Sequence, residues 1–436
     1  MHEITKVEKI IFEGYGLCRT KSGKPVFVWK AVPGDLLEIR IVEEKKSFCR
    51  GEIVKIIEPS TQRIEPVCPH FELCGGCEHQ NLSASDQIKM KEEIFADVMS
   101  RGHLELKPEP IISGSDQDLY YRNVSRFFIQ QDEDQKISYF MHHFNYREGL
   151  VEIKECFLQS KKTNEILEKF KELVNSLEGD KSNFWQIRLR EGKKTNEFMV
   201  EIMTYEPNLP SEAIIGLFKS IEGITSVYHA WNENGNLNRL KRRLLFGAPI
   251  IFEKIGKYKF QISPESFFQT NSLGVETLYN KIKEYAEPKV GETILDLYCG
   301  TGTIGLYLST LPKKIIGVEI VPEAIRDAID NAKINKVQNC EFICSEAERW
   351  FYKNYKTKFD KIIIDPPRSG LTRELITNIG ACDFGSIVYV SCNPATFVRD
   401  VKFFEEQGIK LKKVQPLDMF PQTHHIECVG LLERIS

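Results

Sequence analysis

From about residue 290 onward, short apolar runs alternate with segments that have the apolar spacing of helices. The runs have the composition of buried strands and end at turns; they are ETILDL, KIIGVEI, CEFIC, KIIID and SIVYVS. Alternating strands and helices are typical of a mostly parallel sheet. The pattern therefore predicts an α/β domain with a Rossmann-like sheet over residues 263–436.

The first 60 residues show a different pattern, in which short β-rich runs are separated by glycine turns. Short strands with regular turn signals favour a small, OB-like β-barrel over residues 1–60. Strand-like and helical segments are mixed between these two regions, which predicts a central α+β domain over residues 61–262. We therefore expect three domains.

The last apolar run leads directly to Cys392. Pro394 cannot donate to a strand ladder and biases Asn393 away from helix, so we expect the strand to stop here. Ligands of open α/β sheets bind at the carboxyl ends of the strands. A thiol at this edge can act as a nucleophile if its pKa is lowered, although a lone cysteine is more often an inert core residue.

A glycine-rich turn follows the first apolar run of the predicted Rossmann-like domain. Residues 300–305 fit G-x-G-x-x-G, and Glu319 ends the next strand, where an acid can hold ribose hydroxyls. Asp365 begins an Asp-Pro-Pro motif after the fourth strand. Nucleotide-dependent dehydrogenases share the glycine turn, but DLYCGTG together with Asp-Pro-Pro resembles S-adenosylmethionine-dependent methyltransferases.

Cys68, Cys74 and Cys77 form a C-x5-C-x2-C pattern in a loop rich in glycine and proline. Thiolates at this spacing can converge on one metal centre. We expect Cys156 to be the fourth ligand. His70 or His79 in its place would indicate zinc in a Cys3His site.

Composition narrows the class of protein further. The chain has 436 residues, of which 42% are hydrophobic and 28% charged, with a net charge of -3, so any contact with RNA must use local basic patches. No apolar run reaches membrane-spanning length, and the N-terminus lacks the apolar core of a signal peptide. We expect a cytoplasmic protein without membrane attachment, in which twelve cysteines serve metal binding or catalysis.

Two segments have residues that suit RNA. Aromatic and basic residues are interleaved in the predicted barrel, as in Tyr15, Phe27 and Trp29 with nearby lysines. In the central domain, Arg122 and Arg126 are candidates for phosphate contacts. An ordinary barrel with solvated charges is the alternative.

Several motifs occur together along the chain, namely the four cysteines, SFFQTN, DLYCGTGTIG, GVEIVPEAI, DPPRSGL, YVSCNPATFVRD and HHIECVGLLER. In this order they resemble the RNA uracil-5-methyltransferases over nearly the whole length. VPGDLLEIRI in the predicted barrel resembles the TRAM domain. The combination is most similar to the ribosomal RNA branch, which implies 23S ribosomal RNA as substrate, with transfer RNA as the alternative.

The resemblance implies a role for each candidate residue. Cys392 is the nucleophile, and Glu427 is the base that removes the C5 proton. The implied cofactor residues are Gln269, Tyr298, Thr303, Glu319, Glu346 and Asp365. The implied cofactors are S-adenosyl-L-methionine and a [4Fe-4S] cluster held by Cys68, Cys74, Cys77 and Cys156.

The chemistry explains why these residue types are needed. Addition of a thiolate to C6 turns uracil into an enolate whose C5 can attack a methyl sulfonium, and a base must then remove the C5 proton. His424 and His425 are rival bases. The target is expected to be a flipped-out loop uridine, bound by a monomer. Alternative functions are an amino-methylating adenine or guanine methyltransferase, a noncatalytic iron–sulfur RNA-binding protein and a cytosine-5-methyltransferase.

Overall fold

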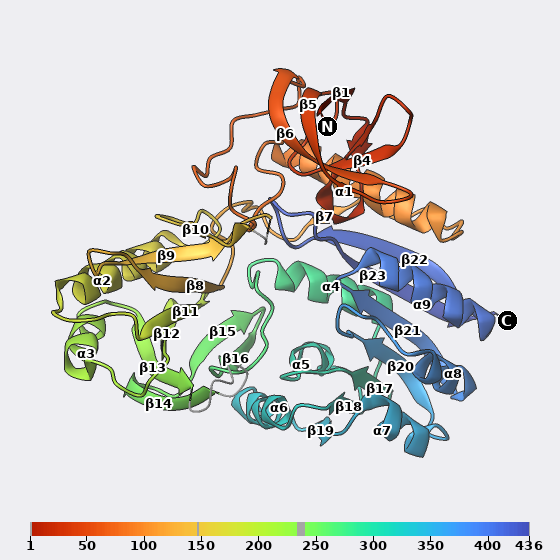
Figure 1. The fold of residues 1–436 in the computed structure, drawn as a ribbon. Helices are drawn as coiled ribbons and strands as arrows, with labels where there is room; N and C mark the ends of the chain where they lie inside the picture. The colour runs from red at the N-terminus through yellow and green to blue at the C-terminus, as the bar shows by residue number, and fades with distance from the viewer. Residues whose placement is uncertain (1, 146–147, 233–239, 436) are drawn as a thin grey trace.

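The computed structural model describes residues 2–145, 148–232 and 240–435. Over these ranges the chain forms a six-stranded, a seven-stranded and an eight-stranded sheet, with a separate two-stranded hairpin. Figure 1 shows the N-terminal sheet in red above the other two, which lie side by side in yellow-green and blue. No helix in these ranges is long and apolar enough to cross a membrane.

The N-terminal sheet has the order β1-β5-β6-β4-β3-β2. Its elements are β1 (His2–Lys6), β2 (Lys9–Ile10), η1 (Phe12–Gly14), β3 (Gly16–Arg19), β4 (Pro25–Val28), β5 (Leu36–Glu44) and β6 (Cys49–Glu58). Register shifts between β5 and β6 bend this sheet, and alternate residues such as Val26, Leu37 and Ile39 fill its interior. The curled sheet fits the small barrel that the sequence predicts.

The central sheet has the order β10-β9-β8-β11-β12-β13-β14. Its strands are β8 (Val124–Gln131), β9 (Ile137–His142), β10 (Leu150–Glu152), β11 (Phe184–Gly192), β12 (Glu197–Thr204), β13 (Ile224–Asn232) and β14 (Leu240–Gly247). Helices α2 (Lys161–Ser176) and α3 (Ser211–Lys219) pack together through the stacked rings of Phe170 and Phe218, 5.9 Å apart. The hairpin of β15 (Ile251–Ile255) and β16 (Tyr258–Ile262) leads to the C-terminal sheet.

The C-terminal sheet has the order β19-β18-β17-β20-β21-β23-β22-β7. Its strands are β7 (Ile112–Ser113), β17 (Thr293–Leu297), β18 (Lys314–Glu319), β19 (Cys340–Cys344), β20 (Phe359–Ile364), β21 (Phe384–Ser391), β22 (Ile409–Asp418) and β23 (Glu427–Arg434). Its helices are α4 (Val275–Ala286), α5 (Thr303–Leu308), α6 (Pro322–Ile334), α7 (Ala347–Asn354), α8 (Arg373–Ala381) and α9 (Pro394–Glu406). Strands β17 to β21 are parallel, whereas β23 lies antiparallel between β21 and β22. The α/β fold with a Rossmann-like methyltransferase sheet is confirmed.

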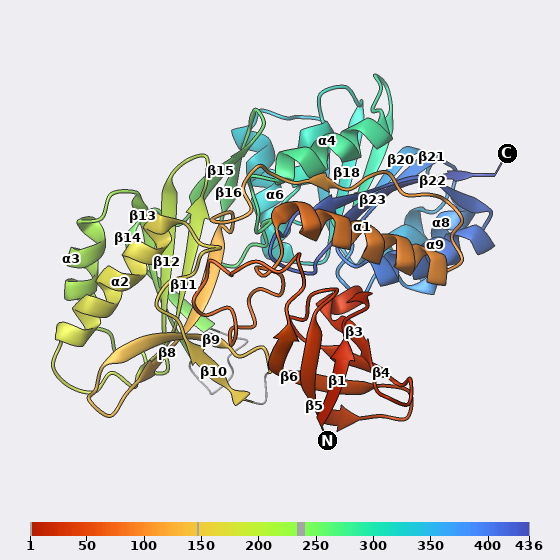
Figure 2. The ribbon, with the colours of Figure 1, turned by 90° about the horizontal axis from the view of Figure 1, so that it is seen from above.

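Helix α1 (Ala84–Arg101) and β7 belong spatially to this C-terminal sheet, although the sequence places them within the predicted central domain. Strand β7 pairs in parallel with β22, and α1 packs against α9 and β22 (Figure 2). The buried Lys91 of α1 donates to Asp418 at 2.6 Å. The boundaries predicted at residues 60 and 262 stay a prediction, but the polypeptide between them contributes to two of the sheets.

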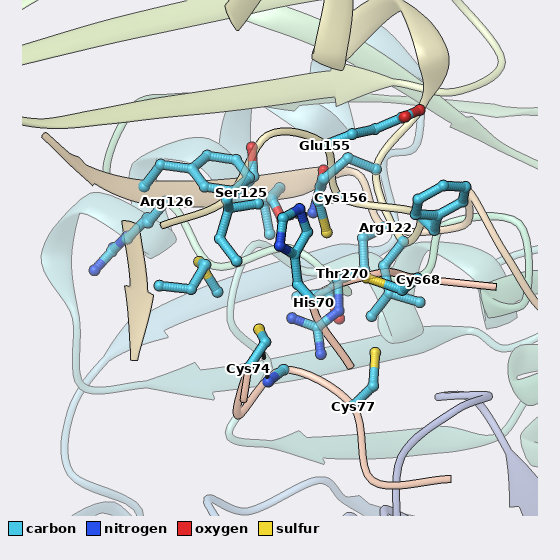
Figure 3. A pocket seen from close by; sticks show the side chains of 18 of the residues that line it. Cys68, His70, Cys74, Cys77, Arg122, Ser125, Arg126, Glu155, Cys156 and Thr270 are labelled. Carbon is cyan, nitrogen blue, oxygen red and sulfur yellow. Dashed lines mark hydrogen bonds between the residues drawn. The ribbon is translucent and has the colours of Figure 1, made fainter. Parts of the chain in front are cut away.

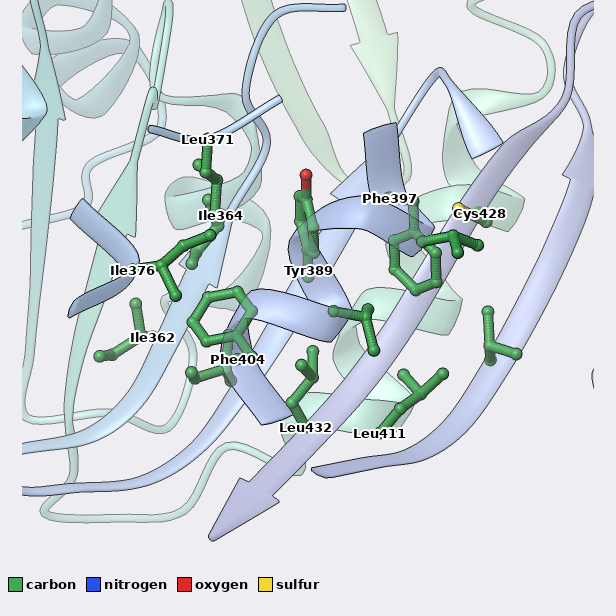
Figure 4. Close-up of a cluster of buried hydrophobic side chains, with 14 of the residues drawn as sticks. Ile362, Ile364, Leu371, Ile376, Tyr389, Phe397, Phe404, Leu411, Cys428 and Leu432 are labelled. Atoms are coloured by element: carbon green, nitrogen blue, oxygen red, sulfur yellow. The ribbon is translucent and has the colours of Figure 1, made fainter. Parts of the chain in front are cut away.

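A buried apolar cluster fixes α9 over β21 and β23 (Figure 4). The ring of Phe397 lies 5.3 Å from the ring of Tyr389 and directly over Gly430, where an added Cβ would come within 2.7 Å of it. Burying such a side chain stabilises the fold by about 1.5–3 kcal/mol. This packing matters for the site because Cys392 lies between β21 and α9.

Candidate active site

Cys392 lies in the turn between two rigid elements. Strand β21 ends at Ser391 and α9 begins at Pro394, as the proline in this motif predicts. The Asn393 side chain caps the helix by accepting from the backbone N–H of Ala395 at 3.0 Å. The thiol is half-buried and directly precedes a helix N-terminus, whose partial positive charge favours a thiolate.

Glu427 is the first residue of β23, the antiparallel neighbour of β21. Ser391 pairs with Cys428 in this ladder. One further step of the same register sets Cys392 beside Glu427, so strand pairing brings together two residues that are far apart in the sequence. Glu427 is buried.

The charges of the two residues affect each other. Burial, together with the nearby carboxylates of Glu427 and Asp365, raises the pKa of Cys392 to about 11, and Arg368 opposes this shift. Burial also raises the pKa of Glu427 to about 8, reinforced by Asp365 and opposed by Arg368. Asp365 follows β20, and burial raises its pKa to about 6. The structure thus places a thiol, two acids and an arginine at the carboxyl edge of the sheet.

The glycine turn lies at the same edge, between β17 and α5. Gly302 has φ 77°, and a Cβ there would lie 2.7 Å from the Phe342 ring, so only glycine fits. The non-glycine residue Tyr298 also has a positive φ, 61°, in this turn. Backbone strain of this kind occurs at ligand sites.

The predicted cofactor residues surround this turn. Glu319 ends β18 and accepts from the backbone N–H of Gly300 at 3.2 Å. Thr303 begins α5, and its hydroxyl lies 2.6 Å from that of Tyr279 on α4. Glu346 precedes α7, where its side chain caps no backbone N–H.

Gln269 lies in the SFFQTN loop before α4, which is fixed at two points. Its carbonyl accepts from the Asn123 side chain at 2.8 Å, and Asn271 of the same loop donates to the Met419 carbonyl at 2.9 Å. Met419 follows β22 in the connection that leads to Glu427. The SFFQTN loop is therefore tied both to the central sheet and to the segment before the predicted base.

The four predicted cluster cysteines line one cavity of about 410 Å³. Figure 3 shows their side chains around this common space, with Arg122 and His70 beside them. Burial raises the pKa of Cys68 to about 11 and also raises that of Cys74. Thiols in such surroundings stay protonated unless a positively charged group binds them.

The positions of the possible ligands show whether the cysteine cavity contains a preformed site for a single metal ion. Within the described ranges, no three or more His, Cys, Asp or Glu side chains are gathered as a single ion requires. One zinc ion needs its sulfur ligands at about 2.3 Å. The His70 ring accepts from the backbone N–H of Lys154 at 3.1 Å, so its Nε2 is already engaged. The described residues therefore show no preformed metal site at these cysteines.

Two arginines that the sequence singled out lie at the cysteine cavity. Arg122 and Arg126 both line it, and Arg126 is exposed, so their contact with phosphates stays a prediction. The Nε of Arg122 is buried there and has no hydrogen-bond partner in the described part of the chain. The DPPRSGL motif alone indicates no role for Arg368, because only the fold brings this residue close to Cys392 and Glu427.

Fold and site together define a class of protein. A parallel sheet with an inserted antiparallel strand, a glycine turn and an acid at the end of the next strand are the features of an S-adenosylmethionine-dependent methyltransferase. Comparison with known sequences is more specific. The family model tRNA (Uracil-5-)-methyltransferase matches residues 85–435, and the chain belongs to this family.

Relatives and a solved structure agree with this assignment. An uncharacterized RNA methyltransferase of Bacillus cereus is 35% identical over 447 residues, covering 98% of this chain and 96% of the relative. Another, of Clostridium acetobutylicum, is 36% identical over 431 residues, covering 94% and 92%. The crystal structure of Pyrococcus abyssi tRNA (uracil-54, C5)-methyltransferase in complex with S-adenosyl-L-homocysteine has a TM-score of 0.78 and 29% identity, covering 98% of this chain and 100% of that chain.

The chain is therefore an RNA methyltransferase, and S-adenosylmethionine is its methyl donor. The site fits this cofactor. Open space lies beside Gly300, where an added Cβ would meet nothing within 4 Å. The Oδ1 atom of Asp296 is buried at this turn and has no partner among the described residues.

Proposed function

We propose that this protein methylates C5 of a uridine in RNA through a covalent bond between Cys392 and C6 of the base. The observation that carries the proposal is the β21–β23 register, which sets Cys392 beside Glu427 at the sheet edge that holds the glycine turn. Neither a dehydrogenase nor an amino-methylating enzyme needs a thiol and a buried acid in this arrangement.

The proposed steps use the residues of this edge. The Cys392 thiolate adds to C6, and the electron pair of the C5–C6 bond moves toward O4 as an enolate. S-adenosylmethionine, when bound beside the glycine turn, would supply the electrophilic methyl group that C5 takes up, with S-adenosylhomocysteine as the leaving group. Glu427 then accepts the C5 proton, the C5–C6 double bond re-forms, and the Cys392 thiolate leaves.

Glu427 suits this task because of its environment. Its raised pKa, about 8, makes it a stronger base than an exposed carboxylate when it is ionised. His425 is a weaker candidate because burial, together with the neighbouring His424 and Arg368, lowers its pKa to about 3. We assign the cofactor contacts to the residues at the glycine turn and its neighbouring loops, which are Gln269, Tyr298, Thr303, Glu319, Glu346 and Asp365.

We also propose that the cysteine cavity holds a [4Fe-4S] cluster. The support is that Cys68, Cys74, Cys77 and Cys156 line one cavity, beside the Nε of Arg122, which has no hydrogen-bond partner among the described residues. A cluster with four thiolates is anionic, and this arginine would offset its charge. Iron and acid-labile sulfide measured on anaerobically purified protein test this; zinc without sulfide would exclude a cluster.

Two classes of RNA are candidates for the substrate. We propose 23S ribosomal RNA, because the TRAM-like barrel combined with the cysteine motif resembles the ribosomal branch. Transfer RNA is the second candidate, because the Pyrococcus abyssi enzyme, named for transfer RNA, matches 98% of this chain. The protein is proposed to act in the cytoplasm as a monomer.

Mapping 5-methyluridine in both RNA classes from a deletion strain and its parent tests the function. Loss of one 5-methyluridine from 23S RNA, restored by the cloned gene, is expected. Loss from transfer RNA alone would replace the ribosomal assignment. Unchanged 5-methyluridine in every RNA, with loss of another methylated base, would refute uridine methylation.

A further inference from the structure

Arg368 is a charged residue close to Cys392 and Glu427 that the proposed chemistry leaves without a role. It follows the Asp-Pro-Pro turn after β20, and its side chain is exposed. Its carbonyl accepts from the Asn393 side chain and from the Thr396 hydroxyl, each at 3.3 Å. The arginine is thereby tied to the start of α9, directly after Cys392.

The guanidinium is held by a neutral ring rather than by an acid. Its Nη2 lies 3.2 Å from Nδ1 and 3.1 Å from Nε2 of His425. By contrast, the neighbouring Arg399 is paired with the buried Asp400 at 2.7 Å. Among the described residues Arg368 forms no such ion pair, so its positive charge is available to an anion at the rim of the pocket.

The shape of a nucleotide indicates which anion arrives there. In the usual anti conformation of a pyrimidine nucleotide, the C6 edge of the base faces the side of the sugar that bears the 5′ phosphate. A thiol that adds to C6, from either face of the ring, is therefore close to the 5′ side of the sugar. An exposed cation beside the thiol is then well placed to reach the same phosphate.

We infer that Arg368 binds the phosphodiester on the 5′ side of the target uridine and that His425 holds the guanidinium in place for it. The inference rests on the proposed addition of Cys392 to C6. Arginine suits phosphate because its planar fork can donate two parallel hydrogen bonds.

This contact would also protect the nucleophile. A phosphate brought close to Cys392 disfavours the thiolate, because two negative charges repel each other. An arginine between them offsets that repulsion. In the free protein, Arg368 already opposes the burial-driven rise in the pKa of both Cys392 and Glu427. Anchoring the substrate and keeping the thiol reactive are then achieved by one side chain.

The test uses two synthetic RNA hairpins that carry the mapped target uridine. One is unmodified, and the other has a neutral methylphosphonate in place of the phosphodiester 5′ to that uridine. The wild-type protein and Arg368→Gln are compared by kcat/KM for methylation. A charge-assisted contact predicts that wild type loses about 10- to 100-fold on the methylphosphonate RNA. Arg368→Gln is expected to lose at least the same factor in kcat/KM on the natural RNA, and the methylphosphonate should cost this variant nothing further.

His425→Ala should show the same pattern with a smaller loss, because it loosens Arg368 without removing the charge. Arg326→Gln is the matched control, since Arg326 is 68% exposed on α6 and pairs with Glu323. It should behave as wild type on both RNAs. If the fold loss in kcat/KM caused by Arg368→Gln and that caused by the methylphosphonate multiply when the two are combined, the inference is overturned. The variant and the modified RNA would then affect two independent contacts.

A binding measurement without S-adenosylmethionine separates this inference from the proposed function. The dependence of RNA affinity on salt should be shallower for Arg368→Gln by about one phosphate contact. An unchanged slope would refute the phosphate contact even if uridine is methylated. A shallower slope in a protein that methylates another base would refute the proposed function and leave the phosphate contact standing.

Discussion

The buried ion pair between Lys91 and Asp418 offers a sharp test of how the site is supported. Its side chains are 0% and 4% exposed, and Nζ lies 2.6 Å from Oδ1. Lys91 also donates to the Phe420 carbonyl at 3.1 Å, in the connection that leads to Glu427. Lys91→Met leaves the Asp418 charge buried and uncompensated, which costs about 3–5 kcal/mol of the free energy of unfolding.

Urea unfolding followed by the fluorescence of Trp350, which is buried on α7 against the same sheet, measures this loss. Lys91→Met together with Asp418→Asn should recover part of it, because the stranded charge is then gone. Lys314→Met is the control, since its pair with Glu341 is 47% and 54% exposed and such pairs contribute about 0–1 kcal/mol. A loss below about 1 kcal/mol in Lys91→Met would show that the pair does not hold α1 to this segment.

Further predictions concern the thiol and its neighbours. Glu427→Gln should accumulate a protein–RNA adduct, seen as a slow band on a denaturing gel, because addition proceeds and proton removal does not. Between about pH 8 and 11, where wild-type Glu427 is ionised, the same variant should react faster with iodoacetamide at Cys392, since loss of a nearby negative charge lowers the thiol pKa. Methylation by wild type should rise with pH through about 8, because Glu427 must lose its proton to act as a base; a rate that falls over this range would exclude that role. Phe397→Ala should cost about 3–5 kcal/mol of unfolding free energy, measured by urea titration.

Local sequence patterns predicted the strands and turns at the site well. Pro394 and Asn393 mark the end of β21 and the cap of α9 because each acts on its own backbone. The Gly300–Gly302 turn could also be predicted from the sequence, since its positive φ angles favour glycine at fixed spacing. Such features depend on neighbours in the chain, so one sequence suffices to find them.

Contacts between distant segments were not predictable in this way. Nothing in the alternation of β23 says that it inserts antiparallel between β21 and β22, so the residues alone could not show that Glu427 faces Cys392. The attachment of α1 to the C-terminal sheet was missed for the same reason, because a buried Lys91 looks like any surface lysine until Asp418 is placed beside it. A role for Arg368 could likewise be inferred only from its tertiary contacts.

Trapping the enzyme on RNA tests the central claim most directly. A hairpin with 5-fluorouridine at the target position blocks the final proton removal, because fluorine cannot leave as a cation. Incubation with the protein and S-adenosylmethionine, followed by protease digestion and mass spectrometry, should yield one cross-linked peptide whose modified residue is Cys392. A methylated RNA released from a Cys392→Ala protein, or an adduct on any other cysteine, would contradict the account.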